Sequence, residues 1–203
     1  SVLGDPNLEA ETIDSYEYVI MYQDTDFTFE SVLFNSNWRN AITLVPVATG
    51  SSTNQYQNIH ASRSQGLELS STKQYVSWLL RGNLSYVKSK NTSDNIDYQA
   101  FPKWMSSLNA EYKFPTMNAM VGIWYRHMEQ YALSDNLEFD TKTDQSYDRF
   151  DLYGFWKISK NSQFSAQIYN LLDAPVPLPS YYGSEGGWQD LSQQFSVSYK
   201  YLF

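Results

Sequence analysis

The chain of 203 residues contains no cysteine, only two histidines and fewer basic than acidic side chains. The absence of cysteine rules out a disulfide framework and thiolate metal sites. The 14 lysines and arginines form no cluster, and the net charge is −8, which argues against nucleic acid as a partner because phosphate binding needs clustered cations. Mean hydropathy is −0.50, and no apolar run approaches the roughly 18 residues of a membrane-spanning helix, so a helical membrane protein is excluded.

Catalytic and metal-binding constellations are equally scarce. Neither His60 nor His127 is spaced with carboxylates as a zinc site or a catalytic triad would require. No set of serine, histidine and acid lies in a recognisable local motif. We therefore expect no enzyme, no bound cofactor and no metal site.

Aromatic side chains, by contrast, are abundant, and they alternate with polar ones. The residues between Gln194 and the end of the chain place an apolar side chain at every second position: Phe195, Val197, Tyr199, Tyr201 and Phe203. A period of two is typical of a strand with one apolar and one polar face. The pattern recurs in segments at about 13–23, 27–37, 58–71, 75–89, 104–114, 118–130, 147–159, 163–172 and 189–203. It predicts an all-β fold, an antiparallel up-and-down meander of about nine strands.

The connections between these segments alternate in length. Short ones are expected at 24–26, 72–74, 115–117 and 160–162, and long polar ones at 38–57, 90–103, 131–146 and 173–188. In a meander every other connection lies at the same edge, so one edge carries tight turns and the other long loops. That asymmetry is typical of transmembrane β-barrels, and a soluble sandwich has no reason to keep it. We expect the face with Val76, Trp78 and Leu80 to point outward. An odd number of meander strands cannot close antiparallel, so we expect a fragment or a truncated product.

Several segments carry a resemblance to a known family. They are GDPNLEAETIDSYEYVI at 4–20, SQGLELSS at 64–71, PKWMSSLNAEYKF at 102–114, YNLLD at 169–173 and the final strand ending in Phe203. In this order they resemble the C-terminal part of the barrel of TonB-dependent outer-membrane receptors. The chain departs from the family pattern at Ala10, where proline is usual, and at 186–188, where Pro-Gly-Arg is common.

The resemblance implies that residues 1–203 are the C-terminal portion of such a barrel, with the plug domain and the N-terminal strands absent. It implies the outer membrane of a Gram-negative bacterium, contact with its lipid, and a TonB system engaged through the missing N-terminal region. The final strand, with Phe203 at the periplasmic end, would be the signal recognised by the barrel-assembly machinery. The cargo would be a small molecule, first a ferric siderophore, with cobalamin or a sugar as alternatives.

Candidate substrate contacts are polar-face cations and loop aromatics. They are His60, Arg126 and Arg149 on polar faces toward the long connections, and Tyr181, Tyr182 and Trp188 in the last long connection. Arginine suits an anionic chelate, and the rings could stack on a catecholate, haem or sugar. The alternative for each of these residues is an ordinary wall or interface residue of a barrel, and lumen walls are generally polar. The alternative for the whole chain is a soluble secreted or surface β-domain that binds carbohydrate through exposed aromatics.

Overall fold

A computed structural model describes residues 1–48, 52–93, 95–98, 102–132, 145–178, 188–190 and 192–202. The long strands are β2 (Thr12–Gln23), β3 (Phe27–Pro46), β4 (Asn54–Tyr75), β5 (Trp78–Asn91), β7 (Trp104–Phe114), β8 (Ala119–Tyr131), β9 (Gln145–Lys157), β10 (Ser162–Tyr169) and β13 (Gln194–Tyr201). Two-residue strands are β1 (Val2–Leu3), β6 (Ile96–Asp97), β11 (Pro177–Leu178) and β12 (Trp188–Gln189). Within these ranges there is no helix with the length and apolarity needed to cross a membrane.

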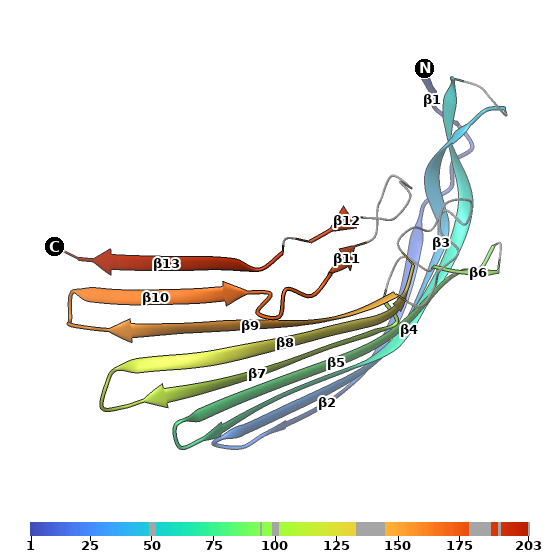
Figure 1. The fold of residues 1–203 in the computed structure, drawn as a ribbon. Helices are drawn as coiled ribbons and strands as arrows, with labels where there is room; N and C mark the ends of the chain where they lie inside the picture. The colour runs from blue at the N-terminus through green and yellow to red at the C-terminus, as the bar shows by residue number, and fades with distance from the viewer. Residues whose placement is uncertain are drawn as a thin grey trace. The chain divides into compact units, whose positions relative to one another are not determined.

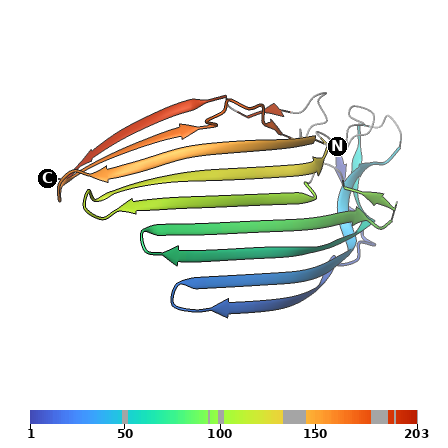
Figure 2. The same cartoon turned by 60° about the horizontal axis from the view of Figure 1, so that its bottom comes forward.

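The long strands pair in chain order. The sheet runs β13-β10-β9-β8-β7-β5-β4-β3-β2, so each long strand lies beside its neighbours in the sequence (Figures 1 and 2). The pairs from β5 to β13 are all antiparallel. The short strand β1 pairs with β4 in parallel, β6 pairs with β5, and β11 and β12 form a separate ribbon. The predicted antiparallel meander is thus confirmed.

The turns after β2, β4, β7 and β9 are short and lie along one edge of the sheet (Figure 2). The last described residues lie at the same edge, because Leu202 N donates to Asn161 O at 2.9 Å and Asn161 Nδ2 donates to Leu202 O at 2.7 Å. One predicted turn was misplaced. Residues 72–74 belong to β4, and the turn is at Val76 and Ser77, where Val76 has a φ of 50°. Val76 is therefore part of the turn and not of the outward strand face.

Two other predicted boundaries were wrong. Most of the expected connection at 38–57 is strand, since β3 continues to Pro46 and β4 begins at Asn54. The end of β3 and the start of β4 carry many polar side chains, and for that reason their sequence resembles that of a loop. The final strand begins at Gln194 and not near Gln189, because residues 188–189 pair with β11 instead.

The chain divides into two compact units, residues 1–18, 33–66 and 87–98 in the smaller and residues 19–32, 67–86 and 99–203 in the larger. In the smaller unit the segment before β2 is fixed to the β3–β4 arms by amide side chains. Asn58 Nδ2 donates to Glu9 O at 3.0 Å and to Asn40 O at 2.7 Å, and Asn40 Nδ2 donates to Glu9 Oε2 at 2.8 Å. The start of the motif at 4–20 thus lies along the hairpin that β3 and β4 form.

The larger unit has an apolar face and a polar face. Successive register pairs form an apolar row across six strands: Leu80, Ala110, Ile123, Leu152, Ile168 and Phe195. The neighbouring register row holds Arg81, Asn109, Trp124 and Asp151, three of which are polar or charged.

Exposure on these two faces is the reverse of that in a soluble protein. Phe195 is 70% exposed and Leu80 43%, whereas Asn109 and Asp151 are each 2% exposed. A soluble sandwich would cover the apolar face with a second sheet. In the described part of the chain, the ribbon of β11 and β12 is the one further sheet.

Candidate functional site

A groove of about 390 Å³ lies on the polar face of the larger unit. Residues of neighbouring strands line it, among them Glu30 on β3, Glu68 on β4, Ser85 on β5, Met105 on β7 and Arg126 on β8. Because side chains at every second position point to one face of a strand, these residues share the polar side of the sheet. The volume is within the range of small-molecule sites.

Arg126 is the cation of this groove. Its guanidinium carbon lies 5.6 Å from the centre of the Trp124 ring, and no carboxylate of the described residues forms an ion pair with it. Ser85 Oγ is buried and has no hydrogen-bond partner within the described ranges. Glu30 and Glu68 are exposed. The groove therefore offers a cation to an anionic group, beside two carboxylates.

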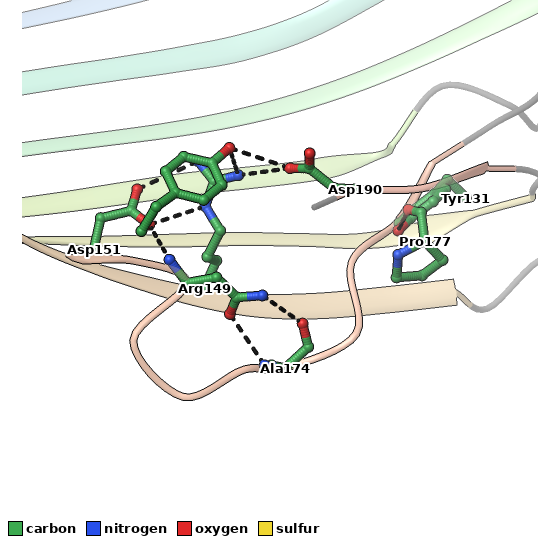
Figure 3. Close-up of polar contacts among 8 residues, drawn as sticks. Tyr131, Arg149, Asp151, Ala174, Pro177 and Asp190 are labelled. Carbon is green, nitrogen blue, oxygen red and sulfur yellow. Dashed lines mark hydrogen bonds and ion pairs between the residues drawn. The ribbon is translucent and has the colours of Figure 1, made fainter. Parts of the chain in front are cut away.

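Arg149 faces Arg126 directly across β8 and β9, but its surroundings are different. It is 4% exposed, its Nη1 lies 3.0 Å from Asp190 Oδ2, and its Nε lies 3.3 Å from Asp151 Oδ1 (Figure 3). Nη1 also donates to the hydroxyl of Tyr169 at 2.5 Å, and the guanidinium lies 4.2 Å from the centre of that ring. Two carboxylates therefore neutralise the charge of Arg149.

A second polar network connects strands closer to the short turns. Arg81 Nη1 donates to Asn109 Oδ1 and to Glu111 Oε1, both at 2.8 Å. Tyr153 donates from its hydroxyl to Glu111 Oε1 at 2.9 Å and accepts from Asn109 Nδ2 at 2.8 Å. The alternation of side chains in the sequence did not predict this network. Its one local signal is Gly122 inside β8, since glycine within a strand often marks a close approach by another group.

A further cluster, which the sequence did not predict, lies on the apolar face of β8 and β9. Tyr125 donates to Asp148 Oδ1 at 2.6 Å, and His127 Nδ1 lies 2.9 Å from the same oxygen. His127 Nε2 lies 3.4 Å from Glu129. Met128 projects to the opposite face, where it faces Met105, so the adjacent His127 and Met128 do not converge on one ligand.

The other predicted contacts are described only in part. His60 lies in β4 in the smaller unit and Trp188 in β12, each with its backbone alone described. Tyr181, Tyr182 and Phe203 lie outside the described residues. Of the six predicted substrate contacts, the structure brings together Arg126 and Arg149 as register partners.

The predicted assembly signal has its described residues on a single face. Phe195, Val197, Tyr199 and Tyr201 are 70%, 69%, 60% and 49% exposed along β13. Their partners on β10 are Ile168, Ala166, Phe164 and Ser162. The apolar face of the sheet therefore continues to its last strand.

Comparison with known proteins identifies the fold. A family model described as TonB dependent receptor-like, beta-barrel, matches residues 1–171. No curated protein matches the chain significantly. Among solved structures, the FrpB iron transporter from Neisseria meningitidis shares 13% identity at a TM-score of 0.80, over 98% of this chain and 32% of that one. The ferric-catecholate import receptor Fiu from E. coli K12 shares 15% at 0.76, over 98% and 29%. The copper transporter OprC shares 16% at 0.74, over 98% and 32%.

These structures are similar in fold alone, given their low identity, and the chain spans about a third of their length. The family model provides the stronger statement because it covers most of the chain. Its members are transport receptors and not enzymes, and the soluble carbohydrate-binding alternative is set aside. The chain belongs to the TonB-dependent receptors, as a part of their β-barrel.

Proposed function

We propose that the chain forms part of the wall of an outer-membrane receptor that imports a ferric siderophore with the help of the TonB system. Residues 1–203 would be the C-terminal portion of the barrel, completed by further strands and a plug domain elsewhere in the full protein. The observation that carries the proposal is the reversed exposure of the two faces in the larger unit, with apolar side chains exposed and polar ones buried.

Lipid is the solvent that suits the apolar face. A row with exposed Leu80, Ile123 and Phe195 would promote aggregation in water but is stable against hydrocarbon. The short turns share one edge with the last described residues. In barrels of the outer-membrane type that edge is the periplasmic one, which gives the long connections to the cell exterior.

A ferric siderophore is the cargo that Arg126 favours. Its guanidinium is not neutralised by a carboxylate of the described residues and can give paired donors to an anionic chelate. FrpB is named an iron transporter and Fiu a ferric-catecholate receptor, whereas OprC is named a copper transporter. Glu30 and Glu68 and the net charge of −8 favour a neutral cargo, cobalamin or a sugar, as the second candidate.

Growth of a receptor-deleted strain tests the proposal. With the full-length gene restored, growth on one ferric siderophore under iron limitation should depend on the gene, and growth on ferrous iron should not. The nutrients tested in the same strain also include cobalamin and oligosaccharides. If growth on every iron chelate is unchanged while one sugar or cobalamin depends on the gene, the siderophore assignment is wrong and only the transporter class survives.

A further inference from the structure

The connection between β10 and β13 begins with a turn that hydrogen bonds of Asn170 hold in place. Asn170 follows β10, is 1% exposed and has a φ of 51°. Its side-chain amide donates to Ala174 O at 2.8 Å and accepts from Ala174 N at 3.0 Å (Figure 3). Its backbone N–H donates to Asp151 Oδ1 at 2.9 Å. The outgoing leg of the connection, residues 170–178, is therefore attached to β9 through Asp151.

The returning leg, residues 188–190 and 192–193, is bound to the outgoing one. Asp190 N donates to Val176 O at 2.9 Å, and Gln193 donates from its backbone to Asp173 Oδ1 at 2.8 Å. The Gln193 side chain donates to Leu171 O at 2.7 Å. Together with the pairing of β11 and β12, these bonds make the two legs one structural unit.

Apolar packing and one hydrogen bond place this unit against the wall. Val176 is 1% exposed and packs with Tyr131, Tyr147 and Met128. Tyr131 donates from its hydroxyl to Pro177 O at 2.7 Å. These contacts come from the ends of β8 and β9 on the polar face, the same ends that carry Arg149.

Arg149 is the charged centre of this junction. Its guanidinium reaches Asp190 on the returning leg, and it is paired with Asp151, which holds the outgoing leg. Both carboxylates lie within ion-pair distance of this one guanidinium. Removing one partner of a buried ion pair is strongly unfavourable because an uncompensated charge remains. A ligand therefore cannot use the guanidinium without dismantling the junction.

We propose, building on the uptake function above, that Arg149 is a positioning residue and not a cargo contact. With Asp151 and Asp190 it clamps both legs of the last long connection onto the polar face. The clamp makes the two described legs a fixed part of the wall beside the groove and leaves Arg126 as the arginine of the pair that contacts cargo.

Hydrogen exchange of the full-length receptor in lipid tests the clamp. Arg149→Lys removes the two-sided guanidinium contact but keeps the charge, and Asp190→Asn is the milder second variant. Each should speed exchange of residues 170–178, 188–190 and 192–193 by about tenfold and leave β7 and β8 protected, with normal receptor levels in the outer membrane. Arg126→Lys, the matched variant at the register partner, should leave exchange in both legs unchanged.

Two outcomes would overturn the clamp. One is unchanged exchange in both legs together with loss of binding to a ferric catecholate probe in Arg149→Lys that equals the loss in Arg126→Lys. The other is an equal rise in exchange throughout β7 and β8, which would assign Arg149 a general role in stability. If instead the legs respond as expected while no iron chelate supports gene-dependent growth, the clamp stands and the siderophore assignment fails.

Discussion

The ring of Tyr153 occupies the space that a side chain at Gly122 would need. A Cβ added at Gly122 would lie 2.5 Å from Tyr153 Cζ, and the two residues face each other across β8 and β9. The ring cannot easily swing aside, because Asn109 and Glu111 hold its hydroxyl. The glycine and the tyrosine therefore form one packing unit within the polar face.

Gly122→Ala should destabilise the receptor by about 1 to 3 kcal/mol, the usual cost of overpacking. The measurement is the denaturant midpoint of the full-length receptor in lipid vesicles. Gly82→Ala is the control, because its Cβ would meet only the ends of side chains, Leu108 Cδ2 at 3.3 Å and Ser71 Oγ at 3.6 Å. Equal midpoints for the two variants would show that the Tyr153 ring yields freely.

Val197→Arg should cost about 2 to 4 kcal/mol if the site lies near the bilayer midplane, and less toward either interface. Val197 is 69% exposed on the apolar face of β13. Ser198→Arg introduces the same side chain one residue later, on the polar face, and should cost far less. Reversible unfolding in lipid measures both. A similar cost for the two variants would contradict contact between lipid and the apolar face.

Deletion of Phe203 should sharply lower the amount of receptor in the outer membrane. The expected reason is that the terminal residue belongs to the assembly signal formed with Phe195, Val197, Tyr199 and Tyr201. Lys200→Ser, a change on the polar face of the same strand, should have little effect. Immunoblots of outer-membrane fractions provide the measurement, and matching levels for both variants would count against the signal.

Arg126→Gln should weaken binding of an anionic ferric chelate about tenfold, because a charge-assisted hydrogen bond is lost. Lys113→Gln is the matched control, since it removes an exposed cation outside the groove. Binding of a ferric catecholate to the purified receptor at two salt concentrations checks the prediction. If the two variants bind equally well, Arg126 has no specific role.

The sheet could be predicted from the sequence because side chains alternate with a fixed period of two. The final strand shows this most clearly, with Phe195 and Val197 on one face and Ser196 and Ser198 on the other. The same rule placed Arg126 and Arg149 on the polar face. The order of the strands followed from the short connections, since a tight turn can join only neighbouring antiparallel strands.

The environment of each arginine could not be predicted. Arg149 and Asp190 are 41 residues apart, and their pairing depends on how the last connection folds back. The end of β3 and the start of β4 could not be predicted either, because a polar strand and a polar loop have similar amino-acid compositions. The role of Gly122 became clear only from Tyr153, which arrives from another strand.

The turn at Val76 depends on the strands on either side of it. Val76 is 84% exposed and adopts a φ of 50°, a conformation that costs a non-glycine residue roughly 1 to 2 kcal/mol. Asn118, by contrast, follows Pro115 in the β7–β8 turn and has a φ of 49°, which asparagine tolerates. The β7–β8 turn is therefore compatible with the preferences of its own residues, whereas the β4–β5 turn is held against the preference of Val76 by the pairing of its two strands.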